Sequence, residues 1–207
     1  MTGKIAYVPA FHVHGLTQFY DPIVRLVMGG TMDRLVDSIN LSSEGSLLDI
    51  GCGPAELLFR IAQRHPNCHL TGLDIDPGIL EVARKKIVGK PITLVQGSAT
   101  QLPFPDSHFD SIVSSLAFHH LTTLQKEQAF AEAFRVLKPG GKFHLFDFGP
   151  PPSFPARILA ALYGLFEEIS DGVKGRLPGM YRRAGFTDIM THWHAYGIIS
   201  LFSGIKP

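Results

Sequence analysis

Short apolar runs alternate with helical patterns along most of this chain from residue 46 onward. The runs that predict strands cover residues 46–50, 69–74, 92–96, 109–115 and 142–148, with two more at 187–194 and 196–205. Patterns with apolar residues three and four apart predict helices at 54–64, 123–137 and 154–169, another after Asp76, and a short one around 180–183. Strands that alternate with helices are typical of an α/β domain built on a parallel sheet.

Local signals support several of these boundaries. Pro54 suits the first turn of a helix, and Asp76-Pro77 combines a capping residue with a helix start. The sequence Lys138-Pro139-Gly140-Gly141 predicts the end of a helix and a turn. Residues 17–40 predict one further helix before the sheet, and no repeat or linker divides the chain. We therefore expect a single domain over residues 1–207.

Composition narrows the class of partner. Hydrophobic residues make up 45% of the chain and charged residues 18%, which excludes a disordered chain. A net charge of +1 gives no broad field that would attract nucleic acid or an anionic surface. The longest apolar helical run, residues 158–166, is far below the roughly 18 residues of a membrane span, and no signal peptide is evident. We expect a cytoplasmic protein without stable membrane insertion.

A glycine loop follows the first predicted strand, in the sequence from Leu47 to Ala55. Gly51 and Gly53 lack a Cβ, so the backbone can turn tightly and a ligand can lie against it. The helix that begins there offers free N–H groups. Asp74 ends the second strand 21 residues after Gly53. A carboxylate at that position can accept both hydroxyls of a ribose, as on sheets that bind adenine nucleosides.

Three more segments occur in a fixed order after this loop: Gly97–Phe104, Phe109–Val113 and Arg135–Gly141. Over residues 45–148 the chain resembles the class I S-adenosylmethionine-dependent methyltransferases, in particular the subgroup of ubiquinone and menaquinone C-methyltransferases. The resemblance implies a three-layer, doubly wound sheet of seven strands in the order 3214576, with strand 7 antiparallel. It also implies S-adenosyl-L-methionine as cofactor and S-adenosyl-L-homocysteine as product.

The same resemblance assigns roles to individual positions. The residues that it places at the cofactor are Asp49, Gly51, Cys52, Gly53, Asp74, Ile75, Ser98, Ala99 and Ser115, with Ser114 as the alternative to Ser115. Asp49 and the glycines should line the methionine end, Asp74 the ribose, and Ile75 with Ser98 and Ala99 the adenine. Two positions depart from the family pattern. Ala55 stands where a third glycine is common, and Ser98 stands where an acidic residue is common.

Two other functions remain open at this point. A nicotinamide-dependent oxidoreductase would need glycine at position 56, where this chain has Glu56, whose charge would repel a pyrophosphate. A non-catalytic protein that binds an adenosyl ligand on the same fold would carry the same glycine loop and Asp74. Tests for bound cofactor and then for methyl transfer would separate these alternatives.

Methyl transfer is an in-line displacement, so positioning supplies much of the acceleration and a base is needed only if the acceptor loses a proton. His119 and His120 follow the fourth strand and are candidates for such a base, with His119 our catalytic assignment and Asp147 a further candidate. A structural role for both histidines in the loop is the alternative. His192 and His194 have spacing that a metal could use, but no third ligand is evident, and we expect no metal.

The substrate-selective parts should be residues 1–40, as a helical cap, and a helical insertion at about 150–180. Both are rich in aromatic residues: Tyr7, Phe11, Phe19, Tyr20, Phe154, Tyr163, Phe166 and Tyr181. We place Tyr20 closest to the cofactor's methionine end. If these rings face inward, the acceptor is a small apolar or aromatic molecule; otherwise they pack the cap on itself. The sequence does not reveal the acceptor, the atom that is methylated, or the oligomeric state.

Overall fold

The computed structural model describes residues 30–39, 41–164 and 169–207. Its centre is a seven-stranded sheet with strand order β3-β2-β1-β4-β5-β7-β6. The strands are β1 (Ser46–Ile50), β2 (His69–Asp74), β3 (Ile92–Gln96), β4 (Phe109–Ser115), β5 (Leu137–Phe148), β6 (Thr187–Ala195) and β7 (Ile199–Ile205). Strands β1 to β5 pair in parallel, and β7 runs antiparallel between β5 and β6. The expected order and the antiparallel seventh strand are confirmed.

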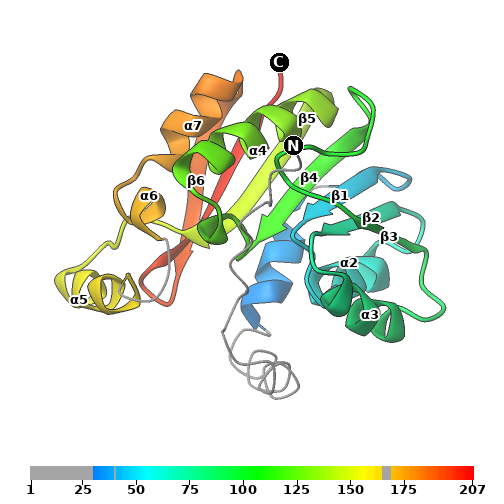
Figure 1. Cartoon of the computed structure of the whole chain (residues 1–207), viewed down its shortest axis with the longest axis horizontal. Coiled ribbons are helices and arrows are strands. Elements are labelled where there is room, and N and C mark those ends of the chain that lie inside the picture. The colour runs from blue at the N-terminus through cyan, green and yellow to red at the C-terminus, as the bar shows by residue number, and fades with distance from the viewer. Residues whose placement is uncertain (1–29, 40, 165–168) are drawn as a thin grey trace, which may run out of the picture.

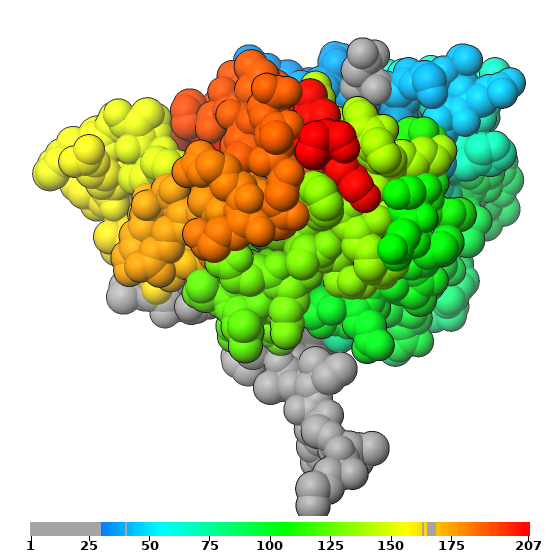
Figure 2. All heavy atoms as spheres, turned by 90° about the horizontal axis from the view of Figure 1, so that it is seen from above, coloured from blue at the N-terminus to red at the C-terminus, as the bar shows by residue number. Residues whose placement is uncertain are grey.

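Helices cover both faces of the sheet and complete three layers (Figure 1). The helices are α2 (Glu56–Arg64), α3 (Pro77–Lys86), α4 (Thr123–Val136), α5 (Phe154–Tyr163), α6 (Ser170–Val173) and α7 (Leu177–Ala184), with a short 3-10 turn, η1 (Phe118–His120). A helix at residues 30–38 packs with α2 and α3 in one apolar core, while α4 and α7 pack in the other. Seen from above, α7 lies beside α4 on the same face of the sheet (Figure 2). The sheet is therefore doubly wound, as expected.

Capping chemistry explains two helix starts. The Asp76 side chain accepts a hydrogen bond from the Gly78 N–H at 2.7 Å, so the expected start at Asp76-Pro77 is confirmed. At α4 the Thr122 hydroxyl accepts from the Gln125 N–H, and the Gln125 side chain accepts from the Thr122 N–H in return. These caps fix where α3 and α4 begin, directly beside the carboxyl ends of β2 and β4.

Four predicted boundaries were wrong. Helix α2 begins at Glu56 rather than Pro54. Helix α5 ends at Tyr163 rather than continuing to 169. Strand β7 begins at Ile199, because residues 196 and 197 form a turn with positive φ. Strand β5 begins at Leu137 rather than 142, since Leu137 already pairs with Phe109 of β4, and residues 138–141 form an irregularity before pairing resumes at Lys142.

Helix α5 exposes its large apolar side chains to solvent and buries its small ones. Its small residues Ala156 and Ala160 are buried against the molecule, whereas Phe154, Ile158 and Leu162 are exposed. The helix projects from the body of the molecule (Figures 1 and 2). Among the helices of the described ranges, none is both long enough and apolar enough to cross a membrane.

Candidate functional site

The glycine loop between β1 and α2 is held by the next strand. The N–H groups of Gly51 and Cys52 both donate to the carbonyl oxygen of Leu73, at 2.8 and 3.0 Å. Gly51 has φ of 74°, and a Cβ added there would lie 2.4 Å from the Cβ of Ala117. Gly53 also has positive φ, but a Cβ there would meet no atom of the described residues within 4 Å. Thus the absent side chain of Gly51 makes room for Ala117, and only Gly53 borders open space as expected for a ligand.

Ala55 explains why a third glycine suits this loop. Its φ of 59° is left-handed, a conformation that costs an L-residue with a Cβ about 1–2 kcal/mol. The Ala55 side chain is buried in the core, and helix α2 starts without a side-chain cap. Alanine is therefore small enough to fit, but the backbone at this position is strained.

Asp49 is buried in β1 with an exposed fraction of 2%, and its Oδ1 atom has no hydrogen-bond partner among the described residues. Burial, and secondarily the nearby Asp74, raises the pKa of Asp49 to about 8. A buried carboxyl group without a partner is costly unless a cation or donor reaches it. The position therefore suits a ligand that brings positive charge.

Asp74 lies beside the loop at the end of β2. Its Oδ2 accepts from the Gly53 N–H at 2.8 Å, and its Oδ1 accepts from the Asp76 N–H at 3.0 Å. Burial raises the pKa of Asp74, although these N–H groups counteract that shift. Each carboxylate oxygen has a second lone pair, so both can still accept from a hydroxyl.

The other predicted cofactor residues lie along the same edge of the sheet. Ile75 is partly exposed after β2, and Ser98 and Ala99 are partly exposed after β3. The Ser98 hydroxyl is 2.8 Å from that of Thr100, so it already has a partner within its own loop. Cys52 is buried, and burial strongly raises the pKa of its thiol. Tyr20 lies outside the described residues.

Two serines end β4 and point to opposite faces. The Ser114 hydroxyl donates to the Ile50 carbonyl at 2.7 Å and is fully buried. Ser115 is partly exposed, and its hydroxyl lies 4.0 Å from the Met32 sulfur. Of the two, Ser115 is the one with solvent access.

Glu56 is not a free negative charge. Its carboxylate accepts from Arg60 at 2.9 Å and from Lys86 at 3.2 Å. Burial favours a higher pKa, but Lys86 and Arg60 outweigh it and the pKa of Glu56 is lowered. The repulsion that we expected between Glu56 and a pyrophosphate is therefore weak. The missing glycine at position 56 remains the sequence feature that disfavours a dinucleotide.

A second cluster lies at the carboxyl ends of β4 and β5. The Oδ1 atom of Asp147 is 3.0 Å from Nδ1 of His119, and its Oδ2 accepts from the His119 N–H at 3.2 Å. The Phe148 N–H donates to Oδ1 at 2.7 Å. Burial alone would raise the pKa of Asp147, but His119 and these N–H groups hold it below its ordinary value. The structure thus joins the two candidates that were predicted separately.

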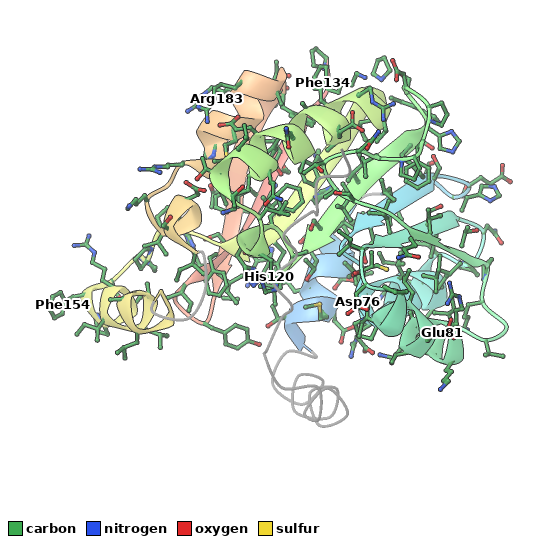
Figure 3. All side chains as sticks on the ribbon, viewed as in Figure 1. Asp76, Glu81, His120, Phe134, Phe154 and Arg183 are labelled. Carbon is green, nitrogen blue, oxygen red and sulfur yellow. The ribbon has the colours of Figure 1, made fainter. Side chains whose placement is uncertain are left out.

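His120 is the neighbour of this pair, with its ring centroid 4.0 Å from that of His119. Burial, followed by the proximity of His119, lowers the pKa of His120 to about 4. The His120 side chain lies on the same side of the molecule as Asp76, which marks the carboxyl edge near the glycine loop (Figure 3). A small pocket adjoins the pair and is lined by Phe118, His119, Lys126, Asp147, Phe148, Ile169, Gly172 and Leu177.

The sequence reasoning missed a buried ion pair beside this pocket. Lys126 on α4 contacts Asp171 on α6 at 3.1 Å, and both side chains are almost fully buried. Thr123 and Arg176 also donate to the Asp171 carboxylate. Lys126 stands in line with the buried Ala129 and Phe130. A lysine on the apolar face of a helix was the signal that could have found the pair.

The remaining candidates from the sequence concern metal binding. No group of three or more metal-ligating side chains occurs in the parts of the chain that the structure describes. His192 and His194 are bonded to Ser203 and Ser200 respectively.

Of the two alternatives for the aromatic residues, neither side chain that the structure describes supports a role in lining the acceptor site. Phe154 is 73% exposed and points away from the molecule (Figure 3). Tyr181 is fully buried in the core, where its hydroxyl donates to the Phe143 carbonyl at 3.2 Å. The remaining aromatic candidates, Tyr7, Phe11, Phe19, Tyr20, Tyr163 and Phe166, lie outside the described residues or have no described side chain.

Comparison with known proteins places this geometry in context. Residues 47–141 match the family model described as a methyltransferase domain. The chain is 28% identical to a ubiquinone/menaquinone biosynthesis C-methyltransferase of Geobacter sulfurreducens, covering 90% of this chain and 84% of that protein. It is 26% identical to a demethylmenaquinone methyltransferase of Thermus thermophilus, covering 91% and 96%. Among solved structures, the S-adenosylmethionine-dependent methyltransferase SibL has the same fold, with a TM-score of 0.75 at 22% identity over 94% of this chain and 60% of that one.

Proposed function

Because this chain belongs to the class I S-adenosylmethionine-dependent methyltransferases, we propose that it methylates a small apolar or aromatic molecule held at the carboxyl edge of the sheet. The observation that carries this proposal is Asp49, whose buried Oδ1 has no partner in the part of the chain that the structure describes. It lies close to Gly53, which borders space that the described residues leave open. S-adenosylmethionine supplies a methyl group on a positively charged sulfur and also carries an ammonium group. A cation at Asp49 would remove the cost of the unpartnered carboxylate.

The roles of this chain's residues follow from their positions. Asp49, Gly51, Cys52 and Gly53 would hold the methionine end, and Asp74 would accept the ribose hydroxyls with its free lone pairs. Ile75, Ser98 and Ala99 would contact the adenine, and Ser115 would lie beneath the sulfur. Because the Ser98 hydroxyl already pairs with Thr100, we expect its contribution to adenine recognition to be small. Tyr20 would close the site from the N-terminal cap.

The relatives' names support an apolar acceptor, because one is a ubiquinone/menaquinone biosynthesis C-methyltransferase and another is a demethylmenaquinone methyltransferase. The cavity beside His119 measures only about 10 Å³, which is room for about one water molecule, and the charged Lys126 and Asp147 are part of its lining. The acceptor would therefore lie outside this cavity. We propose that the acceptor is a reduced quinone or a ring compound similar to one.

Radiolabelled S-adenosylmethionine tests this proposal directly. The protein is incubated with substituted 1,4-benzohydroquinones and 1,4-naphthohydroquinones, and labelled product is identified by mass spectrometry. We expect transfer to at least one of these compounds, and much slower transfer with the Asp74→Ala variant when the cofactor concentration is kept below saturation. If the protein binds S-adenosylhomocysteine but labels none of the quinols, the acceptor class is wrong. If it binds no adenosyl ligand at all, the assigned cofactor site is wrong.

A further inference from the structure

His119 is held at two points by one carboxylate. Asp147 accepts from its backbone N–H through Oδ2 and contacts its ring nitrogen Nδ1 through Oδ1. The Phe148 N–H donates to the same Oδ1. The pair is shielded from water, since His119 is 8% exposed and Asp147 is 2% exposed. Both the position and the rotation of the imidazole ring are therefore fixed.

The state of Asp147 determines the state of the ring. The backbone N–H groups of His119 and Phe148 donate to its carboxylate, and together with the His119 ring they hold the pKa of Asp147 low despite burial. An ionised carboxylate accepts hydrogen bonds but donates none, so Nδ1 of His119 must carry a proton. The lone pair of a neutral His119 then resides on Nε2, the nitrogen that does not face Asp147. A carboxylate that selects this tautomer is the arrangement found in general-base histidines.

The fold places this ring next to the glycine loop. Ala117 lies against Gly51, so closely that a Cβ at position 51 would collide with it, and His119 follows two residues later. The Leu116 N–H donates to the Phe146 carbonyl at 2.8 Å, which ties the same segment to the end of β5. His120 is a poor alternative, because its pKa of about 4 makes it a weak base at neutral pH.

We propose that Asp147 is a positioning residue that holds His119 as the general base of methyl transfer, and that the acceptor loses a proton in the reaction. This inference rests on the proposed function. It restricts the acceptor to compounds with an acidic O–H, N–H or activated C–H at or next to the methylated atom. Thioethers, tertiary amines and pyridines, which accept a methyl group without losing a proton, are excluded.

The step balances without any further reactant. Nε2 of His119 takes the proton, and the electron pair of the broken bond stays on the acceptor. That pair forms the new bond to the methyl carbon while the methyl–sulfur bond breaks, and its electrons remain on sulfur, which becomes a neutral thioether. His119, now an imidazolium beside Asp147, returns its proton to solvent.

Asp147→Asn, His119→Ala and the double variant provide the test, with His192→Gln as the matched control. His192 is also bonded to a side chain, Ser203, but lies on β6 and has no place in the proposed site. We expect kcat at neutral pH to fall about 10²-fold or more in both single variants, the range of general-base contributions. The double variant should be no worse than His119→Ala, because the two residues act as a unit. S-adenosylhomocysteine affinity should stay within about threefold in all four variants, since none alters the glycine loop.

The pH profile separates positioning from a merely structural role. Loss of the anionic partner makes the imidazolium less stable, so in Asp147→Asn the acid limb of kcat should move to lower pH by about one unit. Histidine NMR spectra should show the same shift in the titration of His119, and should show Nδ1 protonated only when Asp147 is present. A folded Asp147→Asn that binds the adenosyl ligand and keeps the wild-type kcat and profile would overturn the inference.

Acceptor class gives an independent outcome. Two compound sets are offered with labelled S-adenosylmethionine: phenols, hydroquinones and primary amines in one, and thioethers, tertiary amines and pyridines in the other. Transfer to the first set alone supports the inference. Transfer to the second set overturns the inference but leaves methyltransferase activity intact. Transfer to neither, in protein that binds S-adenosylhomocysteine, overturns the proposed acceptor and the inference together.

Discussion

Two buried aspartates on neighbouring parts of one sheet are held in opposite states. Asp49 on β1 and Asp147 on β5 are each 2% exposed. Within the described ranges the Oδ1 of Asp49 has no partner, and its pKa rises to about 8, whereas Asp147 has three hydrogen-bond contacts and its pKa is lowered. Equal burial thus accompanies a carboxyl group without a partner on β1 and a fully hydrogen-bonded carboxylate on β5.

This difference separates binding from chemistry. A site built for a cationic ligand keeps a buried carboxyl group protonated, and the ligand's positive charge stabilises its ionised form on binding. A group that must act on a proton is better fixed in advance, so that no rearrangement is needed during the reaction. The β1–β2 half of the edge suits the cofactor for the first reason, and the β4–β5 half suits a base for the second.

The largest effect should come from the glycine loop, where the two glycines have different reasons to lack a side chain. Gly51→Ala combines positive φ with a collision against Ala117, so we expect the free energy of unfolding to fall by about 2–5 kcal/mol. Gly53→Ala should cost only the φ strain, about 1–2 kcal/mol. Urea denaturation measures both.

Substitutions at Gly51 should cost more stability than those at Gly53, but substitutions at Gly53 should cost more cofactor affinity. In variants that remain folded, Gly53→Val should lose S-adenosylhomocysteine binding, because its side chain would occupy the space that borders the loop. Equal destabilisation by alanine at 51 and 53, with binding intact in Gly53→Val, would mean that the loop is only a turn.

An intermediate effect is expected at Asp74. Asp74→Ala should weaken S-adenosylhomocysteine binding by about 1.5–3 kcal/mol, the range for hydrogen bonds to a charged group. Asp76→Ala is the matched control, since it removes the cap of α3 while Asp74 remains. The control should lose about 0.5–2 kcal/mol of stability but bind with nearly unchanged affinity. An unaltered dissociation constant in a folded Asp74→Ala would exclude this carboxylate from ribose binding.

A smaller effect concerns the pH dependence of stability without ligand. A carboxyl group whose pKa is raised by folding stabilises the protein below its unfolded pKa, and that contribution disappears as pH rises through its folded value, here about 8. Asp49→Asn removes this dependence. Relative to wild type, the variant should gain at least about 1 kcal/mol between pH 5.5 and 8.5, seen as a Tm gain of roughly 2–4 °C. If the Tm of the two proteins changed with pH in the same way, ionisation of Asp49 would not destabilise the folded protein, and this prediction would be contradicted.

Much of the fold followed from local patterns. The strands β1 to β4 were predicted with their observed bounds, because each is a short apolar run between clear turn signals. Strand β5 was missed at its start, since the Pro139-Gly140 turn signal is overridden by pairing with β4 and by the bond from the Gly140 N–H to the Lys206 carbonyl. Tertiary pairing decides such cases, and local propensity does not encode it.

The candidate site was only partly predictable for a similar reason. The glycine loop and Asp74 form a motif that a sequence displays directly. The contacts of His119 with Asp147, and of Lys126 with Asp171, join residues 28 and 45 positions apart. The collision between Gly51 and Ala117 also depends on how two loops meet. Such pairings arise from packing, so the sequence indicated candidates without showing which of them touch.

Calorimetric titration with S-adenosylhomocysteine, in wild type, Asp49→Asn and Asp147→Asn, tests the contrast between the two aspartates most directly. The wild type should bind the adenosyl ligand and release a proton at neutral pH, detected as a dependence of the enthalpy on the buffer's ionisation heat. Asp49→Asn should bind at least tenfold more weakly without proton release, and Asp147→Asn should match the wild type. Equal affinity and equal proton release in all three proteins would contradict the assignment of the cofactor's positive charge to Asp49.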